Sequence, residues 1–180
     1  MSDKRAVLRD DEVDVALFTT REGMLSAVGH DLRLKARRST WTWDGDAHTL
    51  TASIETGSIT VESAREGDRD APGSLSDGDK KKIEASMRDD VLRVKKHPEV
   101  QVSAKVSVDG DSAKVSGTVT VVGVAQPFET TARREGARWR ASYVIDQTRF
   151  GIKPYTALLG TLKVARDVRV EVSFAAERLG

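Results

Sequence analysis

The chain has 180 residues, of which 38% are hydrophobic and 32% are charged, and its formal net charge is +1. This length suits one domain over residues 1–180, with a core at about 13–176. The balanced charge argues against a dedicated nucleic-acid or anionic-membrane surface, although a local patch can hide within it, and the absence of cysteine excludes disulfides and thiolate metal sites.

The N-terminal stretch up to Phe18 carries charges every few positions. A secretory signal instead needs an apolar run of about 7–15 residues behind a basic start. No segment approaches the roughly 20 apolar residues of a membrane-spanning helix. We therefore expect no integral membrane segment and a cytoplasmic location.

Alternation of apolar and polar residues dominates the rest of the chain. In each run one face is apolar and the other is polar, as in a strand with a single buried side. The predicted strands lie at residues 13–18, 32–37, 50–54, 59–61, 100–108, 115–124, 138–145 and 168–174.

Short turn signals separate several of these runs. Residues 44–46, 109–111 and 135–136 each contain a glycine next to an acidic residue. Glycine supplies a positive φ at little steric cost. Links this short predict antiparallel neighbours, because a parallel pair needs a long crossover.

One stretch in the first half of the chain breaks the alternation. Residues 64–79 are rich in Gly, Asp, Ser and Arg and contain Pro72. This composition is typical of an exposed loop. We therefore predict that residues 64–79 form such a loop.

A helical pattern follows this loop. Ser76, Asp77 or Asp79 is placed to cap its start, and Pro98 ends it. The spacing predicts one helix of about four turns inserted between strands. The apolar residues at helical spacing are Ile83, Met87, Val91 and Val94.

About eight strands with one apolar face must bury that face. A sandwich or a closed barrel does so, and closure alone removes both exposed edges. The interior of an eight-stranded barrel is either filled by side chains or just wide enough for one small ligand. Valine and alanine leave room inside, and aromatic residues, which would fill it, make up only 5% of the chain.

His30 and Asp31 form the pair that most suggests chemistry. A carboxylate can fix an imidazole tautomer, but neighbours on a strand point to opposite faces, and no third catalytic group is placed by the sequence. We therefore expect a polar residue at the barrel mouth and no catalysis. The only other histidines are His48 and His97, and their spacing predicts no metal site.

The order of several short motifs resembles the YceI-like family over about Val13 to Ala176. Each motif alone is weak, but their shared order and spacing are fairly specific. The motifs are GHDL at 29–32, HPEV at 97–100, GTVTVVGV at 117–124, PF at 127–128, DQTRFGI at 146–152 and ARDVRV at 165–170.

The resemblance implies a lipocalin-like, eight-stranded antiparallel barrel with one inserted helix. It also implies a long apolar ligand, such as a polyisoprenoid, an isoprenoid quinone or a fatty-acid derivative, and often a homodimer. Many family members are periplasmic, and we find no signal peptide in this sequence. No further cofactor, nucleic acid or metal is expected.

The inward faces of the predicted strands are the expected ligand site, with a polar rim at His30, Arg149 and Lys153. The stretch 150–155 is either a loop packed on the barrel end or a lid, and Trp41 and Trp43 share one side of a strand. The expected lining residues are Val15, Leu17, Leu32, Leu34, Ile54, Met87, Val102, Val119, Val121, Tyr143, Ile145, Phe150 and Val170.

Two other functions compete with lipid binding. The first is a protein-interaction or stress-protective scaffold with a filled barrel, which the mixed charged exterior allows. The second is a small enzyme that uses His30.

Overall fold

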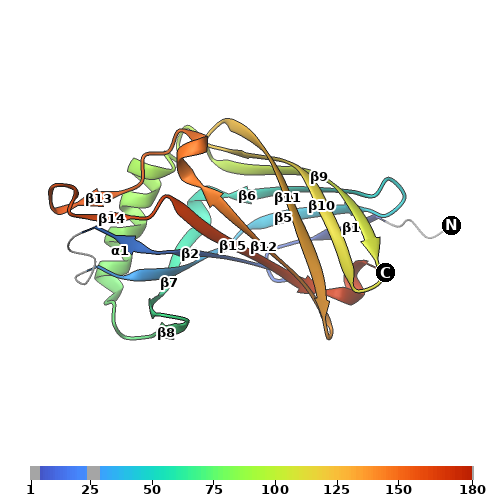
Figure 1. Ribbon diagram of the computed structural model, residues 1–180, viewed down its shortest axis with the longest axis horizontal. Helices are drawn as coiled ribbons and strands as arrows, with labels where there is room; N and C mark the ends of the chain where they lie inside the picture. Colours follow the sequence, from blue (N-terminus) through green and yellow to red (C-terminus); the bar gives the residue numbers. More distant parts are fainter. Residues whose placement is uncertain (1–4, 24–28, 180) are drawn as a thin grey trace.

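A computed structural model describes residues 5–23 and 29–179. Its main element is one curled antiparallel sheet with the strand order β1-β5-β6-β9-β10-β11-β12-β15-β2-β4-β7-β8, which wraps into an elongated barrel (Figure 1). The strands of this sheet are β1 (Arg5–Leu8), β2 (Val13–Thr19), β4 (Asp31–Ala36), β5 (Ser39–Asp44), β6 (Thr49–Glu55), β7 (Ile59–Glu66), β8 (Arg69–Ala71), β9 (Glu99–Asp109), β10 (Ser112–Val121), β11 (Val124–Glu135), β12 (Arg138–Asp146) and β15 (Asp167–Ala175).

Eight long segments account for most of this sheet. Only Arg37 and Arg38 separate β4 from β5, and only the short 3-10 turn η1 (Thr56–Ser58) separates β6 from β7. Each pair is one bent strand, and with β2, β9, β10, β11, β12 and β15 these form the predicted lipocalin-like all-β barrel. The strands differ in detail from the prediction, because the runs 50–54 and 59–61 belong to one bent strand and β11 was not predicted. The two further strands of the sheet, β1 and β8, are short edge strands.

The barrel closes through this bend and not through a continuous ladder. Near one end of the sheet β5 pairs with β6, and near the other end β4 pairs with β7. At the bend the backbone N–H of Arg37 donates to the carbonyl of Ser58, and the N–H of Glu55 donates to the carbonyl of Arg38. The short strands β1 and β8 remain as the two edges of the sheet.

Helix α1 (Asp77–Ser86) continues into the π-helical turn η2 (Met87–Val91) and lies across one end of the barrel (Figure 1). The predicted helix and its cap are confirmed, since the Ser76 hydroxyl accepts a hydrogen bond from the N–H of Asp79 at 3.1 Å. Ile83, Met87 and Leu92 pack against the barrel core. Among the described residues no helix is long and apolar enough to cross a bilayer.

A β-bulge holds the helix against the sheet. The register between β4 and β7 shifts between Arg33 and Leu34, so that Glu62 has no register partner on β4. The N–H of Val61 donates instead to the Glu84 carboxylate of α1 at 2.9 Å. A bulge of this kind turns a backbone N–H of the strand away from the ladder. Here the N–H of Val61 is the group that anchors the helix.

A small second sheet lies at the same end of the molecule as the helix. Its order is β13-β14-β3, formed by β13 (Thr156–Ala157), β14 (Leu162–Val164) and β3 (Arg21–Glu22). The short helical turns η3 (Gln147–Phe150), η4 (Leu158–Gly160) and η5 (Ala176–Leu179) complete the chain.

Two predictions about local structure are wrong. Residues 64–71 are not a loop, because β7 extends to Glu66 and Ala64 pairs with Ala71 of β8. The run 115–124 is not one strand, because Val122 and Gly123 form a tight turn with φ of 44° and 78°. A positive φ is strained for a β-branched residue, so the sequence pattern gives no sign of a turn there.

The close approach of β9 to β10 requires a glycine at position 117. A Cβ atom at Gly117 would lie 2.0 Å from the carbonyl oxygen of Ser103. Alanine is otherwise better than glycine in a strand by roughly 0.5–1 kcal/mol. The backbone contact reverses this preference, because neither strand can move without breaking its ladder.

We predict that Gly117→Ala lowers the free energy of unfolding by about 1–3 kcal/mol or more. Urea denaturation measures this change. Gly57→Ala is the matched control, since a Cβ at Gly57 meets nothing within 4 Å. Equal stability of the two variants would contradict the proposed close contact.

Candidate functional site

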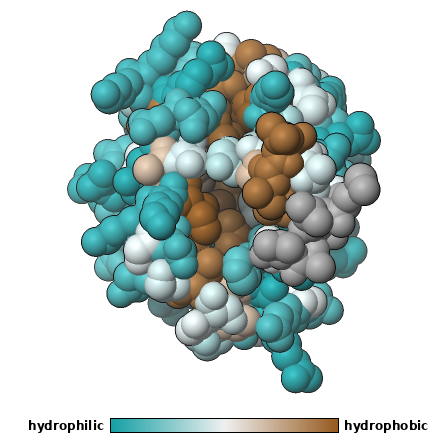
Figure 2. All heavy atoms as spheres, turned by 90° about the vertical axis from the view of Figure 1, so that its left-hand side faces the viewer, coloured by the Kyte–Doolittle hydropathy of each residue, from teal (hydrophilic) through white to brown (hydrophobic). Residues whose placement is uncertain are grey.

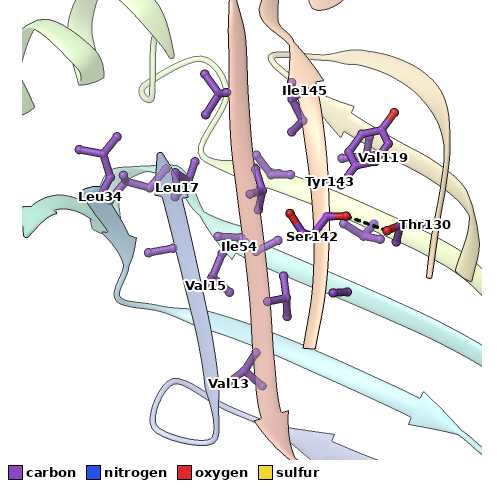
Figure 3. A pocket seen from close by; sticks show the side chains of 18 of the residues that line it. Val13, Val15, Leu17, Leu34, Ile54, Val119, Thr130, Ser142, Tyr143 and Ile145 are labelled. Carbon is purple, nitrogen blue, oxygen red and sulfur yellow. Dashed lines mark hydrogen bonds between the residues drawn. The ribbon is translucent and has the colours of Figure 1, made fainter. Parts of the chain in front are cut away.

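The barrel encloses a cavity of about 1330 Å³. Strands β2, β4, β6, β10 and β12 all turn aliphatic or aromatic side chains into it, as Figure 3 shows for Val15, Leu34, Ile54, Val119 and Tyr143. The alternation in these strands produces this arrangement, because every second side chain points inward. The cavity is larger than the roughly 300–1,000 Å³ typical of small-ligand pockets.

The cavity is long as well as large. On β10 alone, its lining extends from Ala113 to Val121. Eight residue steps in a strand cover about 26 Å at roughly 3.3 Å per residue. An elongated apolar space of this length fits a chain-like molecule better than a compact one.

The cavity opens at the end that carries α1 and the small sheet. Figure 2 looks onto this end and shows a hollow with hydrophobic atoms inside and mostly hydrophilic atoms around it. The basic residues of the lining at this end are Arg21, His30, Lys82 and Lys163. At the far end, the lining includes Arg134 and Arg178.

Most of the residues expected at the site lie in the cavity lining. They come from strands far apart in the sequence and are brought together by the curling of the sheet, as are His30 and both tryptophans, Trp41 and Trp43. The expected residues found in the lining are Val15, Leu17, Leu32, Leu34, Ile54, Met87, Val102, Val119, Val121, Tyr143, Ile145 and Val170.

Phe150, Arg149 and Lys153 lie outside the lining. Phe150 is buried at the barrel end in a cluster with Val122 and Ile152 and with the lining residues Val119 and Val121. The Arg149 guanidinium donates to the Gln126 side chain at 3.2 Å, and Lys153 is exposed. The stretch 150–155 therefore packs mainly against the barrel end, as the loop interpretation predicts, and only Ile152 and Tyr155 from it reach the cavity.

Several lining residues were not predicted from the sequence. Ile83 and Leu92 approach the cavity from the helical segment and the turn that follows it, and Leu162 approaches from β14. Nothing in the alternation assigns these residues to the barrel interior. Phe128 belongs to one of the family motifs, and that motif is the only sequence signal for it.

Side chains hold one seam of the cavity wall. Beyond the residues paired at their hairpin end, β11 and β12 have no ladder contacts. The Thr130 hydroxyl donates to the carbonyl of Ser142 at 2.7 Å across this seam (Figure 3), and the rings of Phe128 and Tyr143 meet edge to face at 5.6 Å. The wall is thus closed by side chains where the backbone separates.

Asp31 is engaged by Arg21 and not by His30. Its carboxylate accepts the Arg21 backbone N–H at 2.9 Å and lies 3.8 Å from the Arg21 guanidinium. This pairing fixes the backbone at the cavity mouth. His30 lies beside it in the lining, exposed at the opening.

In the part of the chain that the structure describes, two ionisable groups have shifted pKa values, and neither lines the cavity. Partial burial lowers the pKa of His97, and the cations Arg93 and Lys96 act in the same direction. Hydrogen bonds from Thr148 lower the pKa of Asp146. Residues 5–23 and 29–179 contain no group of three or more His, Asp or Glu side chains that could hold a metal ion.

Comparison with known proteins places this geometry among known folds. Residues 10–176 match the family model of the YceI-like domain. A comparison with curated proteins found no match.

Three solved structures show the same fold. BcnA of Burkholderia cenocepacia has 13% identity and a TM-score of 0.60 over 91% of this chain and 96% of that chain. A polyisoprenoid binding domain from Saccharophagus degradans, implicated in plant cell wall breakdown, has 12% identity and a TM-score of 0.63 over 96% and 98%. The Campylobacter jejuni YceI protein has 16% identity and a TM-score of 0.53 over 77% and 78%.

Substitution of two different alanines by phenylalanine tests whether the cavity is empty space. Ala141 lines the cavity, whereas Ala104 is buried at 5% exposure outside the lining. We predict that Ala141→Phe changes the free energy of unfolding by less than about 1 kcal/mol, while Ala104→Phe lowers it by about 1–3 kcal/mol or more. Chemical denaturation measures both, and an equal loss in the two variants would indicate a filled core.

Proposed function

The chain belongs to the YceI-like family, and from this membership and the cavity we propose that it binds one long apolar molecule inside the barrel. A polyisoprenoid, an isoprenoid quinone or a fatty-acid derivative has the required shape. The protein then carries or sequesters its ligand and performs no reaction on it. The observation that supports this proposal best is the long aliphatic cavity.

Burial of a hydrocarbon chain supplies enough free energy without any specific polar contact. Each methylene moved from water to an apolar site gains about 0.8 kcal/mol. Ten buried methylenes give about 8 kcal/mol, which corresponds to a Kd near 1 μM before the costs of association. A ligand that fills a cavity of this length buries more than that.

The polar mouth suggests how the ligand is oriented. Arg21, Lys82, Lys163 and His30 lie in the lining at the α1 end. A carboxylate, phosphate or quinone oxygen at the head of the ligand would find hydrogen-bond donors there, while its tail extends toward Trp43 and Trp139. We therefore propose a ligand with an apolar tail and a small head that accepts hydrogen bonds.

The competing scaffold function needs a filled barrel. A cavity of about 1330 Å³ disfavours it, because interiors that serve only stability are packed with few voids larger than a water molecule. An enzyme that uses His30 has little support either, since Asp31 is engaged by Arg21.

We predict that Ala141→Trp weakens binding of a fluorescent long-chain acyl probe at least tenfold. The indole fills space that the chain would occupy, and loss of two buried methylenes already corresponds to about tenfold in affinity. Titration of the probe followed by fluorescence measures the Kd. The wild-type protein is expected to bind the probe at micromolar concentration or better.

Val144→Trp is the matched control. Val144 lies on the same strand three residues further on, but it faces outward and is 52% exposed. Its substitution is expected to leave the Kd unchanged. If the wild-type protein does not bind the probe, or if both variants bind it equally well, the proposed function is wrong.

A further inference from the structure

The hairpin between β13 and β14 exposes apolar side chains beside the cavity mouth. Leu159 is fully exposed at 105% relative accessibility, Leu158 is 54% exposed and Tyr155 is 42% exposed. The hairpin extends beyond the end of the barrel (Figure 1), at the end whose opening Figure 2 shows, where one hydrophobic patch borders the hollow on an otherwise mostly hydrophilic rim. Tyr155 also belongs to the cavity lining, so the exposed tip adjoins the cavity.

The backbone of this tip is strained as well as exposed. Leu158 and Leu159 have φ of 52° and 57°, and Gly160 follows with φ of 84°. Left-handed geometry is unfavourable by roughly 1–2 kcal/mol for an ordinary side chain, whereas glycine and asparagine adopt it readily. The two leucines are unfavourable for this backbone geometry, and they are not buried in the core. Residues that are both strained and exposed in this way occur at functional sites.

The base of the hairpin is firmly attached to the barrel end. In β14, Lys163 and Val164 pair with Glu22 and Arg21 of β3. A Cβ at Gly23 would lie 2.4 Å from the carbonyl oxygen of Thr161, so the two segments are in close contact. The tip is therefore held out from the barrel on an ordered base.

The segment that carries the tip is basic, although two of its cations have acidic partners outside it: Lys163 pairs with Glu22, and Arg166 lies beside Asp146 and Asp167. Residues 147–166 contain four basic residues, Arg149, Lys153, Lys163 and Arg166, and no acidic residue, although the whole chain has a net charge of only +1. The acidic Glu22 beside the hairpin is paired with Lys163 at 3.3 Å. An apolar tip within a basic segment complements the surface of an anionic bilayer, where apolar groups reach the acyl boundary and cations contact the head groups.

We propose that the Leu158–Leu159 tip docks the protein on an anionic lipid bilayer, with the cavity mouth facing the membrane. This arrangement brings an apolar ligand from the bilayer to the opening without crossing water. The role of the mouth rests on the proposed lipid binding, but docking itself is tested separately. Two leucines and a few cations give weak, reversible attachment, as a carrier that must leave the membrane requires.

The lack of cysteine allows a direct test at the tip. Leu159→Cys carries a polarity-sensitive NBD label, and Val144→Cys carries the same label on the barrel wall as a control. On vesicles of phosphatidylcholine and phosphatidylglycerol, we expect NBD emission at position 159 to shift to the blue and brighten, with no change at position 144. Added salt or pure phosphatidylcholine reduces the response. An unchanged label at position 159 would overturn the proposal.

A second measurement uses substitutions that suit the backbone. Leu158→Asn with Leu159→Asn removes the apolar groups, adds no charge and tolerates the positive φ. Vesicle flotation is expected to show about tenfold weaker partitioning for this double variant and no change for Val144→Asn. Unaltered partitioning of the double variant contradicts docking through the tip. Light scattering without vesicles tests whether the tip instead binds a second copy of the chain. A wild-type dimer that the double substitution abolishes would also contradict docking on a bilayer.

Binding of the soluble acyl probe in the absence of vesicles separates this proposal from the cavity function. The double variant is expected to bind the probe with wild-type affinity, because neither leucine lines the cavity. Failure of the wild-type protein to bind the probe, with vesicle docking intact, would remove the proposed cargo and leave the docking surface in place.

Discussion

The structure depends on the burial of the inward rows of apolar side chains, which must be removed from water. These side chains are too small to fill the barrel that they form. Valine, leucine and alanine dominate the inner face, and their burial stabilises the curled sheet by roughly 25 cal/mol per Å². The same residues leave an elongated apolar space. Stability and binding capacity thus come from one set of side chains.

The way the sheet closes determines where this space opens. The bent strands β4–β5 and β6–β7 join the two ends of the sheet, and α1 covers part of one barrel end through the contact of Glu84 with Val61. The remaining opening is bordered by the polar residues Arg21 and Lys163 and by the hairpin that carries Leu159. Basic and exposed apolar groups therefore meet where a ligand would enter.

Much of this architecture follows from the sequence. Alternation predicts the inward residues on β2, β4 and β10, and helical spacing with the Ser76 cap predicts α1. The turn at Val122 and the short strand β8 were missed, since tertiary pairing overrides local preference at both places. Phe150 was misplaced because an apolar residue in a loop gives no sign of which cluster it joins. The size of the cavity depends on the curvature of the sheet, which no local pattern encodes.

We propose that the interior of the barrel holds one long apolar molecule. Native mass spectrometry of the protein purified without detergent, followed by solvent extraction and mass analysis of the released material, tests it most directly. We expect one bound species per chain with a long hydrocarbon tail, and a smaller bound fraction in Ala141→Trp. Protein that carries no such molecule, and takes up none when it is incubated with isoprenoid or fatty-acid chains, would contradict this proposal.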